Sequence, residues 1–247
     1  ITKWMDECKA MGIQTLGPDV NESNLKFTVN HDGNIRFGLG AVKGVGEAAV
    51  QSIMEERKKN GPFLGIFDFV QRVNLNACNK KNMECLALAG GFDSFPELKR
   101  EQYFAANSKG ELFLETLMRY GNRYQADKAA AVNSLFGGEN VIDVATPEIP
   151  QGVERWSDLD RLNRERDLVG IYLSAHPLDE FSIVLEHVCN TRMSELEDKA
   201  ALAGREITMG GIVTSVRRGV SKNGNPYGIA KIEDYSGSTE IPFWGND

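Results

Sequence analysis

The sequence predicts a mainly α-helical, multidomain protein with a small β-hairpin near its start and a truncated antiparallel β domain at its end. Three observations lead to this prediction. Apolar residues recur at helical spacing between residues 36 and 136, and they alternate with polar residues after residue 204. Between these regions, residues 137–155 contain Pro147 and Pro150 and show little periodicity, which is typical of a linker. Residues 1–35 and 156–203 complete the predicted division, the latter as a helical connector.

The composition places the chain among soluble globular proteins. Its 247 residues suffice for two or three small domains, and 41% apolar and 26% charged residues are ordinary values. No apolar run reaches the length of a membrane span, so we expect no membrane partner. The first residues form no signal peptide and lack an initiator Met, which favours the middle of a longer chain. Four cysteines without a C-x-x-C pair favour reduced thiols and a cytoplasmic location over disulfides or zinc.

The first 39 residues are expected to hold a helix, a short strand and a hairpin. The helix has apolar residues at helical spacing and ends at Gly12, and residues 13–16 form the strand. The hairpin turns at residues 30–33, between arms in which apolar residues alternate: Leu25, Phe27 and Val29 on the first, and Ile35, Phe37 and Leu39 on the second.

The segment from Leu39 to Ile53 carries the most informative motif. Gly44 and Gly46 flank Val45, and a helical pattern follows that stops at residues 60–62, Asn-Gly-Pro. A turn this tight requires glycine, and the N–H groups that begin the next helix then point outward without partners. Phosphate is their natural ligand, and Lys43 adds a positive charge. The pattern is that of a helix-hairpin-helix, which contacts the nucleic-acid backbone. The alternative is an ordinary tight turn between two core helices.

The charge distribution agrees with a nucleic-acid contact at this motif. The net charge of −7 alone speaks against such a partner. However, residues 36–81 hold eight Lys or Arg against four Asp or Glu, whereas residues 139–203 hold six against fourteen. The basic block therefore coincides with the hairpin motif, where a phosphate contact needs it.

A second basic helix start follows the motif. Residues 66–70 predict a short helix, and Asn79 is expected to cap another that ends at residues 90–91, Gly-Gly. Lys80 and Lys81 lie in its first turn, where the helix dipole disfavours positive charge. They are either a second, degenerate phosphate contact or two solvated lysines on a helix end.

Residues 97–131 predict two helices, broken near residues 108–110, whose aromatic residues are most simply core. Next come Leu135 and Phe136 before a glycine pair, and they either dock in a partner's pocket or close the local core. Ser157 is expected to cap a helix whose alternating charges, Glu165 included, form a solvated face. In the helix after it, apolar residues are expected to face inward: Phe181, Val184, Leu185 and Val188.

The last 44 residues change to strand periodicity. A long strand contains Ile207 and Val213, a second spans residues 227–234, and a third contains Thr239, Ile241 and Phe243. This order suits a small barrel of the OB type, of which three of five strands are present. Such barrels bind single strands through basic loops and exposed aromatic residues. The candidates here are Arg217, Arg218, Lys222 and Tyr227.

Several stretches, in one order from end to end, together resemble the alpha subunit of bacterial replicative DNA polymerase III. In that family they cover the end of the fingers region, the clamp-binding region with its hairpin motif, and the start of the OB domain. The stretches are residues 5–13, 18–23, 37–46, 88–93 and 165–177, with the strands of residues 207–244.

The resemblance implies roles for particular residues. It implies that Lys43, Gly44, Val45 and Gly46 hold duplex DNA. The family's internal clamp-binding motif (Gln, two variable residues, Leu or Met, then Phe) matches Val132, Asn133, Ser134, Leu135 and Phe136, with Val132 in place of Gln. The resemblance thus favours a contact with the sliding clamp (the beta subunit) over a core role for Leu135 and Phe136. Single-stranded DNA and other replisome subunits are further expected partners.

The resemblance also implies that catalysis lies elsewhere. The family's catalytic carboxylates precede everything in this chain, so we expect no nucleotidyl transfer and no metal site here, while Mg²⁺ serves the parent polymerase. Asp158 and Asp160 form a D-x-D pair without a phosphate cradle. The alternatives are an enzyme that presents nucleic acid on an OB domain, such as a tRNA synthetase, and a stand-alone repair module. The first would need a phosphate loop or a nucleophile constellation, and neither is found in the sequence.

Overall fold

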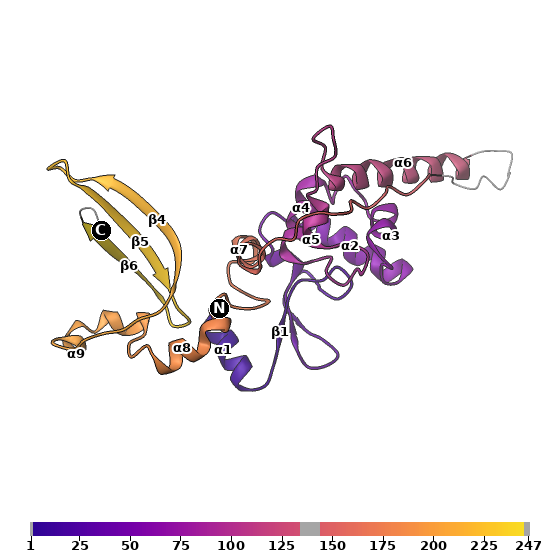
Figure 1. The fold of residues 1–247 in the computed structure, drawn as a ribbon. Coiled ribbons are helices and arrows are strands. Elements are labelled where there is room, and N and C mark those ends of the chain that lie inside the picture. Colours follow the sequence, from indigo (N-terminus) through magenta and orange to yellow (C-terminus); the bar gives the residue numbers. More distant parts are fainter. Residues whose placement is uncertain (1, 134–143, 245–247) are drawn as a thin grey trace. The chain divides into compact units, whose positions relative to one another are not determined.

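The structure is a computed structural model that describes residues 2–133 and 144–244. The chain divides into two compact units, Ile1–Ser174 and Ala175–Asp247 (Figure 1). The predicted connector of residues 156–203 spans the boundary between them, because its first helix packs within the first unit. A mainly helical chain followed by a three-stranded antiparallel sheet confirms the predicted fold class.

The first unit contains most of the helices. Its elements are α1 (Thr2–Ala10), β1 (Thr15–Leu16), β2 (Thr28–Val29), β3 (Ile35–Arg36), η1 (Leu39–Ala41), α2 (Glu47–Asn60), α3 (Ile66–Arg72), α4 (Lys80–Ala89), α5 (Arg100–Tyr103), α6 (Phe113–Asn133) and α7 (Asp158–Val169). The second unit contains η2 (Asp179–Phe181), α8 (Ser182–His187), η3 (Met193–Glu197), α9 (Lys199–Leu202), β4 (Ile212–Val220), β5 (Pro226–Glu233) and β6 (Ser238–Trp244).

The predicted hairpin is present as part of a small three-stranded sheet. β2 and β3 pair antiparallel, with Thr28 opposite Arg36, and β1 joins the other side of β3 in parallel. The turn between the arms is closed by Asn30, whose side chain accepts hydrogen bonds from the main-chain N–H groups of Asp32 and Asn34. This sheet leads directly into η1 and the glycine turn.

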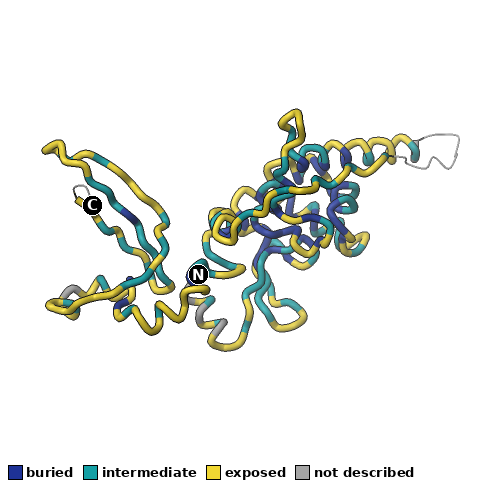
Figure 2. Tube along the Cα trace, in the orientation of Figure 1, coloured by how far each residue is buried: buried dark blue, intermediate teal, exposed yellow. Residues whose placement is uncertain are grey.

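One hydrophobic core joins helices α2 to α7 of the first unit (Figure 2). Phe69 lies at its centre, in edge contact with Phe63 and Phe92. The predicted helix faces are confirmed, because Ala49, Val50 and Ile53 of α2 are buried, as are Met83, Leu86 and Ala87 of α4. The predicted caps are also confirmed, since Asn79 accepts from the N–H of Asn82 and Ser157 from that of Asp160.

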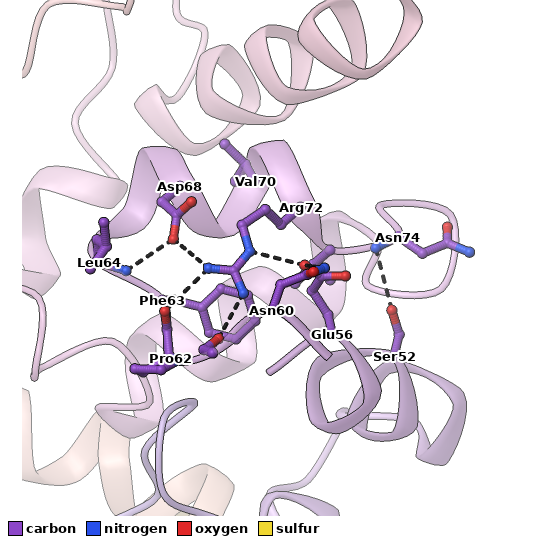
Figure 3. Close-up of polar contacts among 12 residues, drawn as sticks. Ser52, Glu56, Asn60, Pro62, Phe63, Leu64, Asp68, Val70, Arg72 and Asn74 are labelled. Atoms are coloured by element: carbon purple, nitrogen blue, oxygen red, sulfur yellow. Dashed lines mark hydrogen bonds and ion pairs between the residues drawn. The ribbon is translucent and has the colours of Figure 1, made fainter. Parts of the chain in front are cut away.

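Arg72 at the end of α3 fixes the connection between α2 and α3 (Figure 3). Its guanidinium donates to Glu56 of α2 at 2.9 Å, to Asp68 of its own helix at 2.7 Å, and to the carbonyl oxygens of Gly61 and Pro62. The same group stacks over the ring of Phe63 at 4.6 Å. The carbonyl groups that follow α2 are thereby satisfied, and one guanidinium joins α2 to α3.

A buried ion network attaches α7 to this core. Arg100 donates to Asp93 and to Glu165, the latter at 2.9 Å, and Glu165 is only 1% exposed. Glu165 also accepts from the main-chain N–H and the hydroxyl of Ser174. The prediction that Glu165 belongs to a solvated face is therefore wrong. Its neighbours Arg164 and Asp167 are exposed as expected, but Glu165 faces inward because Arg100 supplies a charged partner there.

The second unit holds the antiparallel sheet β4-β5-β6. The predicted first strand starts later than expected, at Ile212 rather than near Ile207. The prediction for the helix before it is wrong in part, because Phe181, Val184 and Val188 are exposed and only Leu185 is half-buried. Apolar spacing identified the helix, but it could not indicate whether a neighbour covers that face. No helix in the described residues is both long and apolar enough to cross a membrane.

Candidate nucleic-acid interface

The turn between η1 and α2 requires glycine at its centre. Gly44 has φ +87°, a conformation that side chains disfavour, and a Cβ atom there would lie 2.6 Å from Sγ of Cys85. Val45 points into the core, whereas Lys43, Gly44 and Gly46 are exposed. The predicted motif therefore has its backbone at the surface and its one apolar side chain buried, so the turn is anchored from within and accessible from outside.

Hydrogen bonds occupy some of the N–H groups of this turn. Lys43 donates to the carbonyl oxygen of Leu168 in α7, and Val45 donates to that of Val42. The N–H of Gly46 donates to Oδ1 of Asn82 at 2.9 Å. The prediction that the N–H groups here are without partners is thus wrong for Gly46. The main-chain N–H groups of Gly44, Glu47 and Ala48 have no acceptor within the described part of the chain.

The start of α4 lies against the same turn. Cε of Lys81 is 3.8 Å from the point where a Cβ of residue 44 would sit. Burial raises the pKa of the Cys85 thiol, and the positive charge of Lys81 nearby offsets part of that increase. The two basic segments predicted as separate contacts are therefore adjacent at Gly44.

Lys80 and Lys81 differ in what they contact. Nζ of Lys80 lies 2.5 Å from Glu115 of α6 and 3.7 Å from Glu84, and the hydrogen bond with Glu115 raises the pKa of Lys80. Lys81 is exposed, and no carboxylate in the described residues forms an ion pair with it. The positive charge of Lys81 is consequently available to an anion at the turn, while that of Lys80 is already neutralised.

The predicted clamp window is only partly described. Val132 and Asn133 are the last residues of α6. Ser134, Leu135 and Phe136 lie outside the described residues, so the choice between a docking segment and local core stays a prediction.

In the second unit, the residues predicted to bind single-stranded DNA do not all lie on one face of the sheet. The register places Gly219, Tyr227 and Trp244 side by side across the three strands, so the side chains of Tyr227 and Trp244 share one face, and that of Arg217 shares it too. The rings of Tyr227 and Trp244 are 5.4 Å apart, and Arg217 pairs with Glu240 at 2.6 Å. Arg218 is on the opposite face. Lys222 lies in the turn between β4 and β5.

Sequence reasoning missed Trp244, although it is 61% exposed on this face. It follows Phe243, and alternation alone could have placed the two rings on opposite faces once the strand was recognised. Sequence reasoning also missed Asn82 and Arg100. Nothing in the sequence joins Asn82 to Gly46, or Arg100 to Glu165, because the partners are 36 and 65 residues apart.

Comparison with known proteins gives a match to the hairpin motif and a longer match along almost the whole chain. Residues 12–103 match the family model described as the helix-hairpin-helix motif. Almost the whole chain also aligns with large bacterial proteins named DNA polymerase III subunit alpha. Over 240 residues the chain is 34% identical to the Pasteurella multocida protein and 32% identical to the Haemophilus influenzae protein. Each alignment covers 97% of the chain and 20% of the relative. The protein from Mycobacterium tuberculosis is 34% identical over 249 residues, 98% of this chain.

The chain is similar to part of DNA polymerase III subunit alpha. The resemblance expected from the sequence is thereby confirmed, and the chain spans about a fifth of the length of the curated relatives it matches. Three of the stretches that carry the resemblance to this subunit meet in the structure. The hairpin segment bonds to Leu168, and Arg100 joins Asp93 to Glu165. These contacts give a physical reason for the three stretches to occur together.

Proposed function

We propose that this chain is a DNA-binding portion of a bacterial replicative DNA polymerase alpha subunit, working in the cytoplasm. In this proposal the turn at residues 43–46 holds a phosphate of duplex DNA. The observation that carries it is the exposed turn at Gly44, with N–H groups that lack acceptors and with Lys43 and Lys81 beside it. The contact reads the backbone, so binding is independent of base sequence and sensitive to salt.

The proposal assigns DNA synthesis to the whole protein rather than to this chain. The support is the name of the relatives, of which the chain covers about a fifth. In the described residues, no three His, Cys, Asp or Glu side chains come together in a group that could hold a metal ion. We place the Mg²⁺ of the parent enzyme outside this chain, and we expect no nucleotide incorporation by the chain alone.

Two further contacts belong to the proposal. The face with Tyr227 and Trp244, which also carries the Arg217–Glu240 ion pair, binds single-stranded DNA, because two adjacent aromatic rings form a stacking surface for bases. Leu135 and Phe136 dock the sliding clamp, with support from the sequence match alone. Other replisome subunits are expected partners of the parent protein.

The variant Gly46→Asp, which introduces a negative charge, tests the duplex contact. A Cβ at residue 46 would meet Oδ1 of Asn82 at 3.9 Å, an ordinary contact, and φ is −77°, so the substitution fits. Aspartate at this position caps α2 and places a carboxylate where the phosphate would bind. We expect affinity for a duplex oligonucleotide to fall about tenfold or more at 50 mM salt, with no loss of melting temperature, because the new cap stabilises α2.

Gly46→Ala is the matched control, because it adds the same Cβ without charge, and it should retain most of the affinity. Adding Lys43→Glu to Gly46→Asp should abolish binding. Unchanged affinity in this double variant would exclude the turn as the DNA contact.

A further inference from the structure

Asn82 is a buried amide that joins two turns of the first unit. It is only 6% exposed, and its Oδ1 accepts the N–H of Gly46 at 2.9 Å. On its other side, Nδ2 donates to the carbonyl oxygen of Ala77 at 3.3 Å and to Oδ1 of Asn79 at 3.0 Å. One side chain thus links the glycine turn before α2 to the turn that precedes α4.

These bonds decide which N–H groups face an anion. Gly46 is the residue before α2, and its N–H would otherwise be one of the unsatisfied donors of the helix start. With Asn82 as its acceptor, this N–H is directed into the protein. The donors of Gly44, Glu47 and Ala48 remain for a ligand, and Lys81 lies beside Gly44.

We infer that Asn82 is a positioning residue for the phosphate contact: it holds Gly46 so that the donors of Gly44, Glu47 and Ala48 are presented together with Lys81. This inference rests on the proposed function. The hydrogen bond between Gly46 and Asn82 also explains why Lys81, the residue before Asn82, reaches the turn at Gly44. A buried amide bonded at both ends resists displacement, because losing a partner would leave a buried polar group unsatisfied.

The alternative role for Asn82 is support of α4 alone. Asn79 offers the matched comparison, since its side chain caps α4 and also contacts Asn82, but it does not accept the N–H of Gly46. Asn79→Ala and Asn82→Ala should both loosen the start of α4 and lower the melting temperature. If Asn82 acts through Gly46, only Asn82→Ala should also change the turn.

The experiment measures binding of a 20-base-pair duplex by the full 247-residue chain across a salt series, together with amide hydrogen exchange. We expect Asn82→Ala to weaken binding about three- to tenfold, the value of one hydrogen bond. The Gly46 amide should lose its protection from exchange. Asn79→Ala should stay within about twofold of the unaltered chain and keep Gly46 protected.

The possible results distinguish a failure of the positioning role of Asn82 from a failure of the proposed DNA binding. Equal losses in the two variants, or unchanged or tighter binding by Asn82→Ala, would overturn the positioning role while duplex binding by the unaltered chain still supported the proposed function. Tighter binding would mean that Asn82 blocks the Gly46 donor rather than presenting its neighbours. If the unaltered chain binds no duplex, both the proposed function and the inference fail.

Discussion

At the scale of single residues, the structure distinguishes two lysines that the sequence treats alike. Lys80 and Lys81 are adjacent on α4, but Lys80 is held by Glu115 at 2.5 Å and Lys81 lies over Gly44. We expect Lys81→Gln to lower duplex affinity and to reduce the slope of log affinity against log salt by about 1, as for one lost phosphate contact.

Lys80→Gln is the control, since it removes the same charge from the same helix turn. It should leave the slope unchanged and should change the affinity by no more than about twofold, because Glu115 already neutralises Lys80. Filter binding or fluorescence anisotropy at four salt concentrations would measure both. Equal effects of the two substitutions would show that only the overall charge of the segment matters.

Individual residues also show what could and could not be predicted from the sequence. The need for glycine at position 44 follows from the motif, and the structure supplies its cause in Cys85. The inward orientation of Glu165 could not be predicted, because it depends on Arg100, which is distant in sequence and reaches it only after the helices pack. A charged residue within a charged helix is ordinarily solvated, and the exception needs a buried partner that periodicity does not reveal.

At the scale of elements, local sequence patterns were sufficient to predict the helices and their ends, but they did not predict which strands pair. Helix spacing, the caps Asn79 and Ser157, and the glycine stop at Gly90 are local in the chain, and each is confirmed. The parallel pairing of β1 with β3 depends on a tertiary approach that no local pattern encodes. The exposed face of α8 shows the same limit, since apolar spacing predicts a helix but not its neighbour.

The connection between α2 and α3 yields a pH-dependent prediction. Burial alone would raise the pKa of Glu56, but hydrogen bonds from Asn60 and Arg72 hold it below its ordinary value of 4.5. A carboxyl group whose pKa is lower in the folded state stabilises the fold above its unfolded pKa, and that stabilisation is lost as pH falls through the folded pKa.

We therefore expect Glu56→Gln to lower the free energy of unfolding by about 1 kcal/mol at pH 7. The difference from the unaltered chain should shrink as the pH falls from about 5 to about 3. Urea unfolding at a series of pH values would measure it, with Glu55→Gln as the exposed neighbour for comparison. A difference that stays constant with pH would show that the ionised form of Glu56 is not what Arg72 recognises.

At the scale of the whole molecule, the two proposed binding surfaces lie in separate units of one acidic chain. The net charge is −7, so neither surface relies on the overall charge. The turn at Gly44 offers main-chain donors and lysines, which suit a phosphate of a duplex. The sheet offers two adjacent aromatic rings on one face, which suit unpaired bases. Because these chemistries differ and the units are distinct, we expect the two activities to be separable by mutation.

Trp244→Ala should lower affinity for single-stranded DNA by about 1–3 kcal/mol, the value of one stacked base. Phe243→Ala is its matched control, because the neighbouring ring is on the opposite face of the sheet and its removal should have little effect on this binding. Duplex affinity should be unchanged in both variants, while Gly46→Asp should show the reverse pattern. Anisotropy titrations of one single-stranded and one duplex oligonucleotide would measure all three. Loss of both affinities in Trp244→Ala would mean that a single continuous surface binds both forms of DNA, and the separation of function between the two units would then be wrong.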